Sequence, residues 1–499
     1  MELRDKDLMS VQEVRNLLDK ARSAQQKLAK MDQQQIDRIV KAISDAGIAN
    51  AEPLAKAAKE ETGFGRWQDK VVKNLFASKT VYEAIKDEKT IGILKEDKEN
   101  KIWDIGVPVG VIAGIVPSTN PTSTVIYKAM IALKSGNAIV FSPHPGAKNC
   151  ILETTKIIAQ AAESAGCPEG AISAVSIPTM QATKELMSND ITSLILATGG
   201  GAMVKSAYSS GTPAIGVGAG NGPAFIDKTA DVPMAVKRIL DSKTFDNGTI
   251  CASEQSIVVE KCMEERVAKE LTRQGAYLLD EARSNQLARF ILRANGTMNP
   301  MIVGKTCAEI AEYAGISGIP ETARVLVGRG SKVGAGEPYS REKLAPILGF
   351  FVEENTDKVL ERCVEILHLE GAGHTFSMHA ENEELVRRFA LAIPASRFLV
   401  NTPGALGGIG ATTQLFPALT LGCGAVGGSS SSNNIGPIDL LNIKRVAAGT
   451  RELDDIKAEA GLQPGSGNLT GTACSRGQNN GFTKEMIDAI VDRILKEIV

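Results

Sequence analysis

The sequence is poor in aromatic residues, has little net charge and contains no long hydrophobic run. Aromatic side chains make up 4% of its 499 residues, too few for the stacking platforms that bind single-stranded nucleic acid. A formal net charge of -2 gives no electrostatic attraction to nucleic acid or anionic membranes. The longest strongly apolar run, 107–116, is too short to cross a bilayer and contains Pro108 and Gly110. The N-terminus lacks the apolar core of a signal peptide, so we expect a cytoplasmic globular protein of two or more domains.

Patterned cysteine and histidine are also missing. The eight cysteines include no Cys-x-x-Cys, and the four histidines form no helical His-Glu-x-x-His site. We therefore expect free thiols in a reducing compartment and no metal site.

Strand-like and helix-like segments alternate along most of the chain. The sequence predicts buried strands at 137–142 and 193–197, with helices at 148–165 and 202–209, a spacing typical of parallel βαβ units. A capping-box pattern predicts that the first helix begins at Ser10. A second α/β block is expected from about residue 230, so the predicted fold class is α/β.

One cysteine stands out because of its neighbours. Cys251 lies between a turn at Asn247-Gly248 and a strand-like run at 255–259, where a bend can present sulfur to a cleft as a nucleophile. From spacing alone a buried structural cysteine is the commoner outcome.

Residues 243–259 resemble the catalytic-cysteine motif of the aldehyde dehydrogenase superfamily, and most of all its CoA-acylating branch, the acetaldehyde and propionaldehyde dehydrogenases. This branch includes the aldehyde dehydrogenase half of bifunctional aldehyde/alcohol dehydrogenases. The likeness extends over about residues 10–447. It implies a Rossmann-like cofactor domain, an α/β catalytic domain and a β extension that joins subunits into a homodimer or homotetramer.

The resemblance assigns Cys251 as the nucleophile and Asn120, in Val116-Pro-Ser-Thr-Asn-Pro121, as an oxyanion donor. An asparagine between Thr119 and a proline is by itself a turn former. Glu342 matches the family glutamate that hydrogen-bonds the nicotinamide ribose, although an exposed glutamate at a helix end would look the same. The remaining residues implied in cofactor binding are Thr119, Ser142, Pro143, His144, Thr198, Gly199, Gly200, Gly218 and His374.

Two of these positions need comment. Ser142 stands where hydrolytic relatives carry a lysine that binds the adenosine ribose. We therefore expect the cofactor to be bound more weakly or differently at this position. His374, in Gly371-Ala-Gly-His-Thr375, matches the acylating branch. An orienting role for CoA or substrate and a purely structural role both remain open.

One departure from the hydrolytic relatives distinguishes the subclasses. Their water-activating glutamate aligns with Val217, and no acidic residue lies between Ser206 and Ile226. An apolar side chain does not activate water, whereas the more acidic CoA thiol needs less activation by a general base. We therefore expect short aldehydes, CoA and NAD as reactants; the alternatives are a hydrolytic aldehyde dehydrogenase and a non-catalytic scaffold of the same fold.

The expected domains follow the resemblance. They are a cofactor domain at 1–228 with a strand extension near 95–106, a catalytic domain at 229–402, a return segment and oligomerisation strand at 403–450, a linker at 461–482 and an amphipathic helix at 483–499. A tail of this form is known from proteins encapsulated in bacterial microcompartments. Docking of this helix on its own subunit and binding to shell proteins inside a microcompartment are equally favoured.

Overall fold

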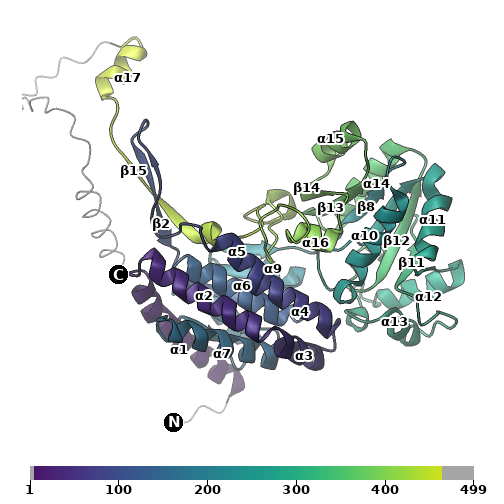
Figure 1. Cartoon of the computed structure of the whole chain (residues 1–499), viewed down its shortest axis with the longest axis horizontal. Coiled ribbons are helices and arrows are strands. Elements are labelled where there is room, and N and C mark those ends of the chain that lie inside the picture. The colour runs from purple at the N-terminus through teal and green to yellow at the C-terminus, as the bar shows by residue number, and fades with distance from the viewer. Residues whose placement is uncertain (1–4, 463–499) are drawn as a thin grey trace, which may run out of the picture.

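The computed structural model describes residues 5–462 and has two α/β bodies and an antiparallel arm that projects from the first body (Figure 1). The predicted linker and tail helix at 461–482 and 483–499 lie outside the described residues, apart from the first two positions of the linker. None of the helices between residues 5 and 462 is long and apolar enough to span a membrane.

The first body is built on a five-stranded parallel sheet with the order β5-β4-β3-β6-β7. Its central strand is buried throughout because helices cover both faces. The strands are β3 (Val111–Val116), β4 (Ala138–Pro143), β5 (Ile172–Ala174), β6 (Thr192–Thr198) and β7 (Ala214–Val217).

Helices on both sides of the first sheet supply most of the core. The helix α6 (Pro121–Lys134) has every residue buried and packs against its neighbours α2 and α7. The helices of this body are α1 (Lys6–Leu28), α2 (Gln33–Ala49), α3 (Ala51–Thr62), α4 (Trp67–Leu75), α5 (Val81–Ile85), α6, α7 (Lys148–Ser164), α8 (Met180–Ser188) and α9 (Gly201–Tyr208).

The predicted start of the first helix at Ser10 is wrong. The helix α1 begins at Lys6, and the Asp5 side chain caps it by accepting from the backbone nitrogens of Asp7 and Leu8. Ser10 lies inside the helix, where its hydroxyl bonds the carbonyl of Asp7 and the hydroxyl of Thr179.

The second body is built on a seven-stranded parallel sheet with the order β10-β11-β12-β9-β8-β13-β14. Its strand β8 pairs with β9 and β13, although residues 223–226 fall within the range expected for the cofactor domain. The strands are β8 (Pro223–Ile226), β9 (Ser256–Glu260), β10 (Ala276–Leu278), β11 (Val325–Arg329), β12 (Ile347–Glu353), β13 (Gly373–His379) and β14 (Ala395–Val400).

Six helices cover the two faces of this second sheet, and a short helix, α16, lies in the return segment beside β13 and β14. They are α10 (Val232–Thr244), α11 (Glu264–Arg273), α12 (Glu281–Ile291), α13 (Cys307–Tyr313), α14 (Thr356–Leu369), α15 (Glu383–Ala392) and α16 (Gly404–Gly408).

The arm is an antiparallel sheet made of β1 (Gly92–Asp97), β2 (Ile102–Pro108) and β15 (Leu441–Ala447). The strand β15 returns from the second body and pairs with β2 along its whole length. Figure 1 shows this arm leaving the helical body and ending near α17 (Leu453–Glu459).

Candidate active site

A cavity of about 460 Å³ lies where segments of the two bodies meet, a size typical of small-molecule sites. It brings together nearly all the residues that the sequence singles out. The predicted residues on its wall are Thr119, Asn120, Ser142, Pro143, His144, Thr198, Gly199, Gly200, Gly218, Cys251 and Glu342.

Cys251 lies on the bend between a 3₁₀ turn at Phe245–Gly248 and strand β9. Residues 246–248 all have positive φ, of 49°, 52° and 75°, and this left-handed backbone is costly for the two residues that are not glycine. Cys251 is half-buried and lines the cavity. Burial, and after it the charge of the Glu342 carboxylate, raise the pKa of Cys251 to about 12, so its thiol is neutral near pH 7.

Asn120 follows β3 and forms the N-cap position of α6. Its Nδ2 donates to the hydroxyl of Thr119 at 3.2 Å and to the carbonyl of Thr249 at 3.3 Å. Both partners also line the cavity, so the amide lies on the same wall as the segment that leads to Cys251.

Glu342 is the only carboxylate on the wall among the described residues. Its Oε1 accepts from the backbone nitrogen of Gly220 at 2.8 Å. Burial, together with the charge of Glu370, raises the pKa of Glu342 to about 7. This side chain is not the exposed helix-end glutamate of the alternative interpretation.

The glycine-rich turn between β6 and α9 leaves space for a ligand. Added Cβ atoms at Gly200 and Gly201 would meet nothing within 4 Å, and these residues begin α9, whose free backbone N–H groups suit an anion. The Thr198 hydroxyl is buried and has no hydrogen-bond partner among residues 5–462. A nicotinamide dinucleotide fits this set, because its ribose hydroxyls and phosphates supply partners for both features.

The carboxyl end of β4 forms another part of the wall. Ser142 exchanges a hydrogen bond of 2.9 Å with Thr183, and His144 Nδ1 accepts from the Gly146 nitrogen at 3.1 Å. Burial lowers the pKa of His144. No lysine or arginine of residues 5–462 lines the cavity.

Val217 also lines the cavity, at the end of β7, and is buried. His374 does not line it. The His374 ring is fully buried. Its Nδ1 lies 2.8 Å from the hydroxyl of Thr375, and its Nε2 has no partner in the described part of the chain. Burial lowers the pKa of His374 to about 3, so the ring is neutral, and its functional role stays a prediction.

The sequence analysis missed the contribution of α8 and its cap. Thr179, Met180 and Thr183 line the cavity although no motif surrounds them. A weak signal existed in Ser-Ile-Pro-Thr at 176–179, which ends a loop and supplies the threonine that caps α8.

Comparison with known proteins agrees with this architecture. The model of the aldehyde dehydrogenase family matches residues 4–339. The bifunctional aldehyde-alcohol dehydrogenase of Escherichia coli K12 is 44% identical over 443 residues, which are 88% of this chain and 50% of that protein. The chain thus spans about half the length of this curated relative.

Two solved structures are similar over nearly their whole length. An acetylating aldehyde dehydrogenase from Geobacillus thermoglucosidasius is 51% identical with a TM-score of 0.89, covering 90% of this chain and 99% of its own. A propionaldehyde dehydrogenase from Rhodopseudomonas palustris, determined with bound CoA and an acylated cysteine, is 26% identical with a TM-score of 0.79, covering 87% and 97%. The chain described here belongs to the aldehyde dehydrogenase family.

Proposed function

We propose that the chain is a CoA-acylating aldehyde dehydrogenase that converts a short aldehyde, such as acetaldehyde or propionaldehyde, with CoA and NAD to acyl-CoA and NADH. The observation that carries the proposal is the wall around Cys251. Val217, which aligns with the water-activating glutamate of hydrolytic relatives, lines the cavity. The one carboxylate on the wall among the described residues, Glu342, accepts a hydrogen bond from the backbone nitrogen of Gly220. A thioester formed there lacks a dedicated base for water and persists until a thiol arrives.

In the proposed reaction the Cys251 thiol loses its proton to solvent, and the thiolate adds to the aldehyde carbon, so that the carbonyl oxygen becomes an oxyanion. The side-chain amide of Asn120 and the backbone N–H of Cys251 stabilise this charge, as preorganised donors do in other acyl transfers. A nicotinamide held by residues such as Thr198, Gly200 and Glu342 would supply the acceptor for the hydride that leaves this carbon. The CoA thiolate then attacks the Cys251 thioester, so that acyl-CoA leaves and the Cys251 thiolate is regenerated.

The relatives support the deacylating nucleophile. One similar structure is of an acetylating enzyme, and another holds CoA beside an acylated cysteine. The wall supports NAD rather than NADP, because it offers no lysine or arginine from the described residues to pair with a 2′-phosphate.

The test follows NADH absorbance with purified protein, NAD and propionaldehyde, with and without CoA, beside Cys251→Ala. Sustained turnover only with CoA, and none in the variant, is expected. Equal turnover without CoA would mean that water deacylates the enzyme. No turnover with propionaldehyde or acetaldehyde would favour the scaffold alternative.

We also propose that the chain is a homo-oligomer joined through the arm. The strand β15 is an edge of its sheet, and an open strand edge is a template for pairing with another chain. Light scattering after gel filtration tests this. Ile443→Pro, which removes a backbone donor in the middle of β15, should shift the protein toward monomer.

The tail at 483–499 is proposed to bind microcompartment shell proteins, because Ile487, Ile490, Val491, Ile494 and Ile498 share one face of the helix that the sequence predicts. Deletion of 462–499 should leave turnover intact and abolish co-sedimentation with shell proteins. Loss of activity instead would show that the tail stabilises the enzyme itself.

A further inference from the structure

A buried lysine connects the loop that carries Asn120 with the turn that precedes Cys251. Lys73 lies on α4, its side chain is 3% exposed, and its Nζ reaches both the loop of Asn120 and the turn that precedes Cys251. The sequence analysis did not single it out, because a lysine on an amphipathic helix ordinarily lies at the surface.

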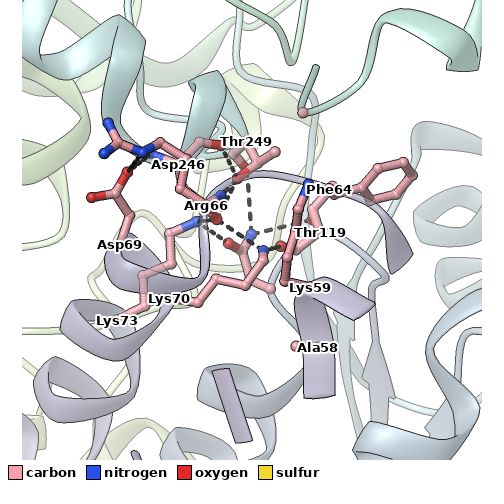
Figure 2. Close-up of polar contacts among 12 residues, drawn as sticks. Ala58, Lys59, Phe64, Arg66, Asp69, Lys70, Lys73, Thr119, Asp246 and Thr249 are labelled. Atoms are coloured by element: carbon pink, nitrogen blue, oxygen red, sulfur yellow. Dashed lines mark hydrogen bonds and ion pairs between the residues drawn. The ribbon is translucent and has the colours of Figure 1, made fainter. Parts of the chain in front are cut away.

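The contacts of Lys73 are short and specific. Its Nζ lies 2.5 Å from Oδ2 of Asp246, 2.5 Å from Oδ1 of Asn120 and 3.0 Å from the hydroxyl of Thr249. Figure 2 shows Lys73 and Lys70 rising from α4 towards Asp246 and Thr249. One ammonium therefore bonds the expected oxyanion donor and the turn of the expected nucleophile together.

Asp246 anchors this ammonium. It is fully buried and also accepts from the backbone nitrogen of Arg66 at 2.7 Å and from Lys70 at 3.0 Å. Its own backbone has φ of 49°, a conformation that persists only where surrounding contacts enforce it. The contacts from α4 thus hold the backbone of this turn as well as the lysine.

The ammonium, together with the Thr249 carbonyl, fixes the orientation of the Asn120 amide. An ammonium has donors only, so the Asn120 atom that faces Lys73 must be the carbonyl oxygen. The amide nitrogen is then directed to the opposite side, where Thr119 and Thr249 line the cavity. Without Lys73, the two orientations of the carboxamide would lie closer in energy.

We propose that Lys73 is a positioning residue for acylation: anchored by Asp246, it holds the Asn120 carboxamide with its N–H groups towards the cavity in which the oxyanion forms. The proposal rests on the proposed function, because it requires an oxyanion beside Asn120. Lys73 itself does not line the cavity.

Lys70 provides a matched control. It is on the same helix, equally buried, and bonded to the same Oδ2 of Asp246. Its other contact is the backbone carbonyl of Thr119 at 3.1 Å, and it makes no bond to the Asn120 side chain. Lys70→Met and Lys73→Met each remove one ammonium from Asp246. Only Lys73→Met also removes the hydrogen bond to the Asn120 side chain.

The experiment measures the burst of NADH formed by full-length enzyme with NAD and propionaldehyde before deacylation, in a double-mutant cycle of Lys73→Met and Asn120→Ala. Loss of an oxyanion donor costs about 100- to 1,000-fold, and we expect this from Asn120→Ala. Lys73→Met should lose about 10- to 100-fold, because a misdirected amide forfeits part of the same stabilisation. The double variant should be within about threefold of Asn120→Ala alone.

Two further readouts separate positioning from a merely structural role. The Tm should fall by similar amounts in Lys73→Met and Lys70→Met, whereas the burst rate of Lys70→Met should fall by less than about threefold. The dissociation constant for NAD should be unchanged in both. If Lys73→Met does not fold, Lys73→Gln, which keeps a neutral donor of similar length, enters the same cycle.

A double variant whose loss is the product of the two single losses would overturn the proposal, as would a wild-type burst rate in Lys73→Met. The burst does not depend on the nucleophile that deacylates the enzyme. Steady-state turnover independent of CoA would therefore contradict the proposed function, but the double-mutant cycle would still test the role of Lys73. Absence of any burst in the wild type would overturn both.

Discussion

The backbone nitrogen of Gly220 donates a 2.8 Å hydrogen bond to Oε1 of Glu342, and the same glycine packs against the backbone of Cys251. A Cβ added at Gly220 would lie 1.7 Å from the carbonyl oxygen of Cys251. One residue without a side chain thus keeps a carboxylate and a thiol on adjacent parts of one wall, where the charge of each influences the other.

Replacing Glu342 should make Cys251 more reactive. Glu342→Gln keeps an acceptor for the Gly220 nitrogen and removes the charge that raises the pKa of Cys251. Because the pKa of Glu342 is about 7, its carboxyl is protonated at pH 6 and charged at pH 8.5. Iodoacetamide should therefore alkylate the variant at the wild-type rate at pH 6 and several-fold faster at pH 8.5. If Glu342→Gln and wild type were alkylated at equal rates at pH 8.5 as well as at pH 6, this prediction would be contradicted. The same gain in the variant Glu337→Gln, in which an exposed glutamate is replaced, would also contradict it.

The free enzyme should show no thiolate plateau near neutral pH. With a pKa of about 12 for Cys251, the thiolate fraction rises about tenfold for each pH unit between 8.5 and 10, where Glu342 is already charged. Alkylation rates of the ligand-free protein should follow this slope, after subtraction of the rate of Cys251→Ala, which retains the exposed Cys262. A plateau near pH 8.5 would show that the ligand-free thiol resembles one in water.

Two glycines near one another should differ sharply in tolerance. Gly220→Ala forces a methyl group into the backbone of Cys251, whereas an added Cβ at Gly218 meets its nearest atoms at 4.0 Å. We expect Gly220→Ala to lose about 2–4 kcal/mol of unfolding free energy together with activity, and Gly218→Ala to keep a wild-type Tm. Thermal unfolding of both variants checks this, and equal Tm values would contradict it.

The grouping of many candidate site residues could be predicted from the sequence, because these residues lie at the ends of strands or at the starts of helices. Asn120 comes after β3, Ser142 lies at the carboxyl end of β4, and Thr198 ends β6. Parallel strands bring such ends to one edge of a sheet. The resemblance supplied the roles of all these residues, including Asn120, Cys251 and Glu342, which periodicity alone could not.

The features that the sequence did not predict depend on tertiary contacts. Ser10 matches a capping box, yet Asp5 caps α1, because one turn of an amphipathic pattern does not say where the helix begins. Lys73 has the charge of a surface residue, and only the packing of α4 against the turn at Asp246 buries it. His374 matched a family motif, but its place off the cavity wall follows from the position of β13 in the sheet.

Glu254 should make the folded state less stable as the pH rises. It is buried, Oε1 accepts from the Gly404 nitrogen at 2.7 Å, and Oε2 has no partner. Burial raises the pKa of Glu254 from 4.5 to about 7. The folded state holds this proton longer than the unfolded state, so the stability it contributes is complete below pH 4.5 and is lost as the pH rises through 7.

The neutral variant Glu254→Gln does not titrate. Its free energy of unfolding relative to wild type should therefore increase between pH 5 and pH 8, by up to about 3 kcal/mol. Denaturant unfolding at the two pH values measures this difference, with exposed Glu281→Gln as control. Parallel changes in wild type and Glu254→Gln would show that Glu254 is already ionised in the folded protein at pH 5.

A carboxylate placed at Val217 should restore deacylation by water. Val217 is buried on the wall of the cavity, so Val217→Glu introduces an acid where hydrolytic relatives carry one. Burial raises the pKa of such a group, and the base form that activates water therefore grows as the pH rises above 7. Turnover without CoA should appear at a small fraction of the CoA-dependent rate, yield free acid rather than acyl-CoA, and increase from pH 7 to 9.

The matched variant Val217→Gln has nearly the same volume and no base, and it should form no free acid above the wild-type background. Product analysis by chromatography distinguishes the two acyl products, and the Tm shows whether either variant is folded. A folded Val217→Glu that still requires CoA at every pH would mean that water cannot reach the Cys251 thioester. In that case the shape of the cavity, and not the missing base, selects CoA.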